Sequence, residues 1–244
     1  MIRKSVSHCI HRAFEMFGYE IQLKKKNNKS GFGDIKYFND GKSPLRQNSR
    51  SINDRFYADK KALHVYFGKE RLDFYSFIIK QIEAEGLDLQ DKSLLDAGCG
   101  SGHLLWFIRK KYTNCRCDGF DFSKHAIQYA KTLLSEGNFF VHDIYTRVPH
   151  TYDVVVCTEV LEHLEYPAKA ILNLLNSLKQ KGVCLITIPN GRFDTLEEHI
   201  NFWSPESWKI FLSELLDKEK YTIHIKSTAR KNIVTFICKN LVKA

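Results

Sequence analysis

Short apolar runs alternate with segments of helical periodicity between residues 93 and 216. Five runs, rich in Val, Ile, Leu, Phe and Cys, are typical of buried strands, and they cover residues 93–97, 115–120, 139–142, 153–157 and 183–188. The spacing of apolar residues predicts helices at 102–111, 123–134, 168–179 and 205–216. This alternation indicates an α/β fold in which helices cover both faces of a mostly parallel sheet.

The two ends of the chain follow other patterns. Residues 221–227 and 232–238 are short strands that few residues separate, which predicts a C-terminal antiparallel hairpin. Upstream of the first strand, one long helix is predicted over 62–86. Residues 24–54 are polar and without periodicity, so we expect a mobile loop. The first helix is predicted over residues 2–17 and packs on the main domain, with a membrane surface or a partner as the alternative.

The net charge of +9 is concentrated near the N-terminus. Residues 1–60 hold 13 basic and 6 acidic side chains, whereas the remainder is nearly balanced. We therefore divide the chain into a basic N-terminal helix with a flexible segment, residues 1–60, and one α/β domain, residues 61–244. Only the first part has the charge to attract an anionic partner, which disfavours a protein that coats nucleic acid along its whole surface.

Composition narrows the class and the compartment. A hydrophobic content of 43% with 27% charged residues is ordinary for a globular protein, and no apolar run approaches the ~18 residues of a membrane span. The seven cysteines are scattered and have no zinc-site spacing. Because the first 18 residues also lack a secretory signal, a reducing cytoplasm is expected.

A glycine-rich loop follows the first predicted strand. Asp96 is followed by Gly98, Gly100 and Gly102 at every second position. The dinucleotide pattern G-x-G-x-x-G fails because His103 stands at its third glycine, and the P-loop pattern also fails. Glycines let the backbone approach a ligand closely, and an acid at the start of the loop suits a ligand with an ammonium group.

Acidic residues also end the next two strands. Asp121 lies 23 residues beyond Gly98, close to the separation at which a strand-end carboxylate accepts from ribose hydroxyls. Phe122 can pack on an adenine face, and Asp143 can accept from an adenine amino group. Each acid alone could be a helix cap, but three at successive strand ends indicate a nucleoside ligand.

Four segments resemble the class I S-adenosylmethionine (SAM)-dependent methyltransferases, in the group of the ubiquinone-biosynthesis O-methyltransferases. They are residues 94–104, 119–130, 152–164 and 182–190, the last ending in Ile188-Pro189-Asn190. The resemblance implies a Rossmann-like sheet of seven strands and a methyltransferase domain over residues 61–244. It also implies that SAM is bound, with Arg71, Gly98, Gly100, Gly102, Asp121, Asp143 and Ile144 as its contacts. Asp96, Phe122 and Thr158 are further candidate contacts of the cofactor.

A second cluster follows the fourth strand, in Glu159-Val160-Leu161-Glu162-His163. A helix from Glu159 would place Glu159, Glu162 and His163 on one face, and His199 follows the fifth strand. Glu159, His163 and His199 are the candidate catalytic residues, because an oxygen nucleophile must lose its proton. Glu159, Glu162, His163 and His199 are also candidate ligands of Mg²⁺ or Mn²⁺, as an alternative to a purely structural role.

The sequence thus predicts SAM-dependent O-methylation of a small molecule, a glycan or a lipid-linked intermediate. One alternative is a metal-dependent RNA 2′-O-methyltransferase, in which the basic N-terminal segment contacts phosphates; nucleic acid is the less favoured partner. The other is a non-catalytic SAM-binding partner subunit. The acceptor and the oligomeric state are not encoded in any recognisable pattern.

Overall fold

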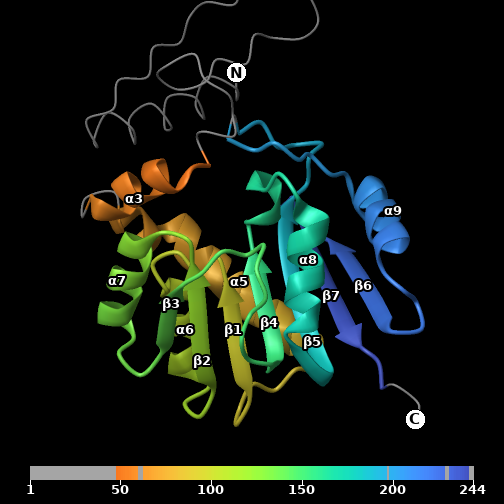
Figure 1. Ribbon diagram of the computed structural model, residues 1–244, viewed down its shortest axis with the longest axis horizontal. Helices are drawn as coiled ribbons and strands as arrows, with labels where there is room; N and C mark the ends of the chain where they lie inside the picture. Colours follow the sequence, from red (N-terminus) through yellow and green to blue (C-terminus); the bar gives the residue numbers. More distant parts are fainter. Residues whose placement is uncertain (1–47, 60–62, 197, 229–230, 242–244) are drawn as a thin grey trace, which may run out of the picture.

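Seven strands form one sheet in the order β3-β2-β1-β4-β5-β7-β6 in the computed structural model, which describes residues 48–59, 63–196, 198–228 and 231–241 (Figure 1). The strands are β1 (Ser93–Ala97), β2 (Arg116–Asp121), β3 (Asn138–Val141), β4 (Tyr152–Thr158), β5 (Leu178–Pro189), β6 (Tyr221–Ser227) and β7 (Asn232–Lys239). The pairs among β1 to β5 are parallel, while β7 runs antiparallel to both β5 and β6. The predicted sheet and its C-terminal hairpin are confirmed.

Helices cover both faces of this sheet (Figure 1). They are α3 (Arg50–Ala58), α5 (Lys69–Ala84), α6 (His103–Lys111), α7 (Lys124–Leu133), α8 (Pro167–Asn176) and α9 (Pro205–Leu215), with the short 3₁₀ helices η1 (His64–Phe67) and η2 (Leu161–His163). Strand side chains alternate between two cores: Leu94 packs with α5, α6 and α7, and Leu95 packs with α8 and α9. The continuous apolar runs of the central strands reflect burial on both faces.

The loop predicted upstream of β1 is partly wrong. Residues 50–54 were expected in a loop, but α3 begins at Arg50. This short helix packs on α7, where the Ser123 hydroxyl donates to the Asp54 carboxylate at 2.5 Å. A helix stabilised mainly by such tertiary contacts leaves little periodicity in the sequence. The helix predicted over residues 2–17 lies outside the described residues.

The long helix predicted over 62–86 is interrupted. Gly68 is in an extended conformation (φ −65°, ψ 151°) and caps α5, so the segment consists of η1 and then α5 from Lys69. Glycine is a poor helix former, which explains a break at this position. The interruption lets η1 leave the axis of α5.

The ends of β1 and β4 define the functional edge of the sheet. β1 and β4 are neighbours in the sheet, but the next strand after β1 lies on one side of this pair and the next strand after β4 lies on the other. Ligands of α/β sheets bind at such a switch point. In Figure 1, α3 and the segment between β5 and α9 lie at this same end, at the top of the view. None of the helices in the described ranges has the length and apolar character needed to cross a membrane.

Candidate active site

A cavity of about 950 Å³ opens at the carboxyl edge of the parallel strands. It is bordered by the turns after β1, β2, β3 and β4, by α3 and η1, and by the segment before α9. Twelve of the sequence-predicted residues line it: Arg71, Gly98, Gly100, Asp121, Phe122, Asp143, Ile144, Thr158, Glu159, Glu162, His163 and His199. Its size is in the range of pockets that bind cofactor-sized ligands.

The glycine loop needs its glycines for conformation and for space. Gly98, Gly100 and Gly102 all have positive φ, at 76°, 50° and 80°. A Cβ on Gly98 would lie 2.6 Å from Val160 Cγ2, and a Cβ on Gly100 would lie 2.6 Å from the Tyr57 hydroxyl oxygen. The loop therefore combines a backbone that other residues resist with close contacts to the turn after β4 and to α3.

Asp121 ties the end of β2 to the glycine loop. One oxygen of its carboxylate accepts from the Gly100 N–H at 3.0 Å, and the other accepts from the Ser123 N–H at 2.8 Å. Burial raises the pKa of Asp121 to about 6, although these hydrogen bonds act in the opposite direction. The carboxylate lines the cavity at the position predicted for the ribose contact.

Asp96 and Gly102 do not line the cavity. The Asp96 side chain is fully buried, and its Oδ1 has no hydrogen-bond partner among the described residues. Burial, together with the nearby Asp121, raises the pKa of Asp96 to about 8. Gly102 packs against α7, where a Cβ would meet Ala130 Cβ at 2.9 Å. Gly102 thus sets helix packing, and Asp96 lies beneath the loop as an unsatisfied acid.

The predicted contacts of the nucleoside differ in exposure. Asp143 is exposed and accepts from the Tyr145 N–H at 2.9 Å, while Phe122 and Ile144 are partly buried. Arg71 is exposed, and its guanidinium carbon lies 5.5 Å from the centre of the Tyr66 ring. These side chains border one cavity, from the turns after β2 and β3 and from α5.

An aromatic cover over the glycine loop was not predicted from the sequence. The Tyr57 hydroxyl of α3 is 2.9 Å from the Tyr66 hydroxyl of η1, and the two rings are stacked. Tyr66 also stacks on His103 with ring centres 5.5 Å apart. Tyr57, Tyr66 and His103 lie on three different helices, and the sequence gives aromatic residues in helices no signal that distinguishes a cover from a core.

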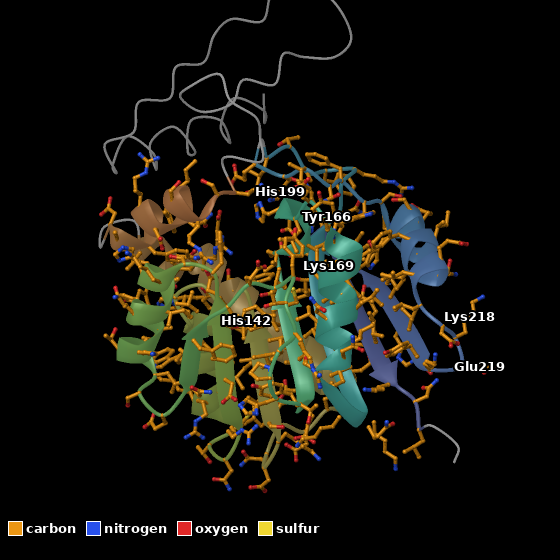
Figure 2. The ribbon with its side chains drawn as sticks, viewed as in Figure 1. His142, Tyr166, Lys169, His199, Lys218 and Glu219 are labelled. Atoms are coloured by element: carbon orange, nitrogen blue, oxygen red, sulfur yellow. The ribbon has the colours of Figure 1, made fainter. Side chains whose placement is uncertain are left out.

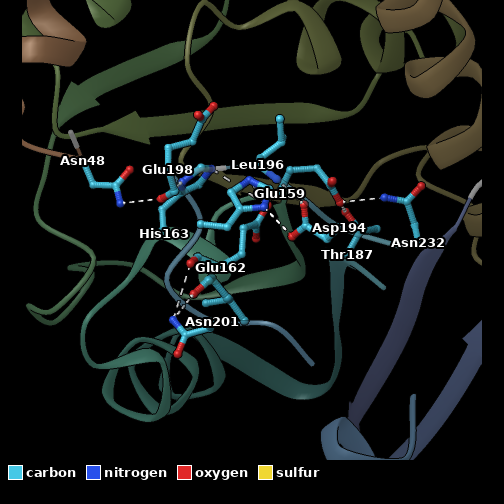
Figure 3. A network of polar contacts seen from close by, with 12 residues as sticks. Asn48, Glu159, Glu162, His163, Thr187, Asp194, Leu196, Glu198, Asn201 and Asn232 are labelled. Carbon is cyan, nitrogen blue, oxygen red and sulfur yellow. Dashed lines mark hydrogen bonds and ion pairs between the residues drawn. The ribbon is translucent and has the colours of Figure 1, made fainter. Parts of the chain in front are cut away.

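Glu162, His163 and His199 form the cluster predicted after the fourth strand (Figure 3). Glu162 Oε1 lies 4.0 Å from His163 Nε2 and 3.9 Å from His199 Nε2. His199 comes from the segment before α9 and is labelled at the top of Figure 2, near η2. Its Nδ1 lies 2.6 Å from the Asp194 carboxylate, a partner that the sequence analysis missed although it stands only five residues away.

The cluster contains an uncompensated buried acid. Glu162 is 0% exposed, and neither of its carboxylate oxygens has a hydrogen-bond partner among the described residues. Burial and the neighbouring Glu159 raise the pKa of Glu162 well above its usual value. Burial and the charge of His199 lower the pKa of His163 to about 4. A cation bound between them would supply the missing countercharge.

Glu159 does not join this cluster. The prediction of a helix from Glu159 is wrong: its φ is +54°, and only η2 forms, from Leu161. Its carboxylate instead accepts from Thr187 Oγ1 at 2.8 Å and from Asn232 Nδ2 at 3.1 Å. The unusual φ directs Glu159 toward β5 and β7, which a helical wheel cannot anticipate.

A methyltransferase family matches this architecture. The family described as "Methyltransferase domain" covers residues 67–215. A ubiquinone biosynthesis O-methyltransferase of Rickettsia bellii is 31% identical over 125 residues, which is 47% of this chain and 49% of that protein. The aligned part therefore spans about half the length of this curated relative.

Solved structures share the fold. A complex of the Haloferax volcanii Trm112 methyltransferase activator with a methyltransferase has a TM-score of 0.63 at 16% identity, covering 78% of this chain and 98% of the other. Magnesium protoporphyrin IX methyltransferase of Synechocystis, with S-adenosylhomocysteine (SAH) bound, has a TM-score of 0.57 at 17% identity, covering 80% and 96%. The family match shows that the chain belongs to the methyltransferase-domain family, and its sheet has the fold of these solved methyltransferases.

Proposed function

We propose that this protein transfers the methyl group of SAM to an oxygen atom of a small-molecule, glycan or lipid-linked acceptor. The observation that carries the proposal is a single cavity bordered by the glycine loop, by Asp121 and by the Glu162–His163–His199 cluster. A cofactor site and a proton-accepting site thus share one space. The names of relatives that act in ubiquinone biosynthesis and on magnesium protoporphyrin IX favour a non-polymeric acceptor over RNA.

The residues present fit the cofactor. Gly98 and Gly100 of the glycine loop line the cavity, Asp121 offers an acceptor for ribose hydroxyls, and Phe122 and Asp143 border the side assigned to adenine. SAM supplies a methyl group already activated by its sulfonium. The protein then has to exclude water and hold the acceptor oxygen in line with that methyl group.

His199 is the best placed base in the cluster. The Asp194 carboxylate accepts from its Nδ1–H, which leaves Nε2 as the acceptor that faces Glu162 and the cavity. A carboxylate that fixes the tautomer of a histidine in this way is the arrangement used by general bases. Nε2 would take the proton of the acceptor hydroxyl as the oxygen attacks. His163, the second imidazole, is held by the Glu198 backbone carbonyl at 3.3 Å from its Nδ1.

Glu162, His163 and His199 also fit a divalent cation such as Mg²⁺ or Mn²⁺. Their ligand atoms all lie within 4.8 Å of one another, and carboxylate with imidazole is a donor set that such ions accept. A bound cation would lower the pKa of an acceptor hydroxyl. The Asp194–His199 contact resembles the outer-shell carboxylates that orient metal-binding histidines. The uncompensated Glu162 carboxylate supports this second role of the cluster.

The cysteines support the expected compartment. The six described cysteines are all free, and five of them are buried. Such a set is typical of a reducing environment, so we retain the cytoplasm as the proposed location.

Methyl-label transfer tests the proposed activity. Labelled SAM and fractionated cell extract are incubated with wild type, with Glu162→Gln and with the control Glu165→Gln, whose carboxylate borders the cavity outside the cluster. We expect label in a small-molecule, glycan or lipid pool. We expect a loss of about 100-fold or more in Glu162→Gln, and little change in the control.

The other pools decide between the alternatives. Label in RNA that falls steeply with salt would favour the RNA enzyme. Tight binding of SAM without label in any pool would favour a non-catalytic partner. If the rate after chelation is the same with and without added Mg²⁺ or Mn²⁺, the metal-dependent mechanism is refuted. His199 then remains as the proposed base.

A further inference from the structure

The helix α3 covers the part of the cavity that we assign to the cofactor. Its Tyr57 lies over the glycine loop, since a Cβ on Gly100 would be 2.6 Å from the Tyr57 hydroxyl oxygen. The N–H of the same glycine donates at 3.0 Å to Asp121, the proposed acceptor for the ribose hydroxyls. Tyr57, Gly100 and Asp121 all line the cavity. A ligand bound at Gly100 and Asp121 would therefore lie against α3.

Little buried surface holds α3 in this position. None of the residues 50–58 that form it is buried, whereas α5 buries five side chains. A helix of nine residues is not stable on its own in water. Elements with few buried apolar contacts open locally at a low cost in free energy. We therefore expect α3 to leave its place while the sheet stays folded.

Polar contacts hold α3 to two different walls of the cavity. The Ser123 hydroxyl, at the start of α7, donates to the Asp54 carboxylate at 2.5 Å. Just before α3, Asn48 Nδ2 donates at 2.9 Å to the backbone carbonyl of Glu198, in the segment before α9 (Figure 3). Single hydrogen bonds of this kind contribute little net free energy, because water replaces them when they open. α3 thus bridges the two walls through contacts that break readily.

Ser123 connects one of these contacts to the cofactor site. Its N–H donates to Asp121 Oδ1 at 2.8 Å, while its hydroxyl donates to Asp54 Oδ1. A ligand that binds Asp121 would fix the position of Ser123, and with it the donor that holds Asp54. Cofactor binding and the docking of α3 are then coupled, so that each stabilises the other.

We propose that α3 is a lid, which opens to admit the cofactor, closes over it with Tyr57 against the glycine loop, and opens again to release SAH. This inference rests on the proposed function and adds a gate to it. With α3 docked, the cavity still measures about 950 Å³, so the closed lid leaves room for a ligand. A closed lid also excludes water from the methyl group during transfer.

The rates of SAH binding test the lid, with surface plasmon resonance on the immobilised protein as the measurement. Asp54→Ala removes the acceptor for Ser123, and Asp54 does not itself line the cavity, so no ligand contact is lost with it. Asp54→Asn removes the charge and keeps an oxygen that can accept from Ser123. Tyr57→Ala removes the cover itself. Tyr166→Ala is the control, because Tyr166 is an exposed tyrosine that does not border the cavity.

A gate changes both rate constants, since a ligand that enters only the open state associates more slowly by the fraction of open molecules. We expect Asp54→Ala to raise the association rate constant about 10-fold and the dissociation rate constant at least as much. Tyr57→Ala should change both in the same direction. Asp54→Asn and the control Tyr166→Ala should stay close to wild type.

Three results would overturn the lid. Unchanged association in Asp54→Ala and Tyr57→Ala, with faster dissociation only in Tyr57→Ala, would make Tyr57 a ligand contact on a fixed helix. Equal rates in Asp54→Asn and Asp54→Ala would assign the effect to charge. Slower association in Asp54→Ala would mean that a docked α3 is needed for binding. If Tyr57→Ala fails to fold, Asp54→Ala decides. Absence of SAH binding to wild type would refute the proposed function and the lid with it, whereas unchanged rates in the variants would refute the lid alone.

Discussion

Buried acids distinguish this site at the scale of single residues. Their positions at strand ends were predictable, because Asp96 and Asp121 belong to recognisable motifs. The raised pKa values of the two acids could not be predicted, because they depend on burial and on a neighbouring carboxylate, which is Asp121 for Asp96 and Asp54 for Asp121. The contact of Asp194 with His199, within one loop of no regular structure, and the position of Tyr57 over Gly100, on a helix far along the chain, were also missed because no local pattern marks either of them.

Asp96 gives a pH-dependent prediction. Its pKa in the folded protein is about 8 against 3.8 for the ordinary group, so the folded state binds one more proton than the unfolded state between these values. The contribution of Asp96 to the free energy of unfolding is therefore fully present below pH ~4. It is lost as the pH rises to 8, and the free energy of unfolding falls by up to about 1.4 kcal/mol per pH unit.

Asp96→Asn removes this titration. We expect the free energy of unfolding of the variant, relative to wild type, to rise between pH 5 and pH 8 in the absence of ligand. Urea unfolding at several pH values measures the difference. Parallel profiles for the two proteins would show that Asp96 is not titrating in a buried site.

At the scale of elements, the alternation of strands and helices was predicted well because both faces of the sheet are buried. Bounds agreed to within a residue or two for most strands, and β5 proved longer, since its exposed start, Lys179 to Lys181, is polar. α3 and the break at Gly68 were missed. The helix α3 depends on its tertiary contact with α7, whereas the break at Gly68 has a local cause, the poor helix propensity of glycine.

α3 joins the two sides of the cavity. Asp54 accepts from Ser123 at the cap of α7, and Asn48, just before the helix, donates to the Glu198 carbonyl at 2.9 Å (Figure 3). We therefore expect Asp54→Ala to loosen α3. Amide hydrogen exchange followed by mass spectrometry should show faster exchange over residues 50–58, with the sheet unchanged, and SAH should dissociate faster.

Unchanged exchange over residues 50–58 in Asp54→Ala would contradict the anchoring role of the Ser123 contact. Faster exchange in the whole domain would point to general destabilisation instead.

At the scale of the whole molecule, the excess of basic residues lies in the first quarter of the sequence, and the remainder is nearly neutral. The fold could be predicted from the sequence because seven strand patterns and four motif segments agree on it. The acceptor could not, since it depends on the shape of a cavity built from α3, η1 and the segment before α9. These parts carry no motif, and they are where methyltransferases of one fold differ.

The most direct test of the central claim is calorimetric titration of SAH into wild type and into Asp121→Asn. Asn keeps one of the two backbone hydrogen bonds of Asp121, so the fold should persist, while the charged acceptor for the ribose is lost. The account predicts one SAH site per chain in wild type and binding weaker by about 10-fold or more in the variant. Equal affinity in the two proteins, or no binding to wild type, would contradict it.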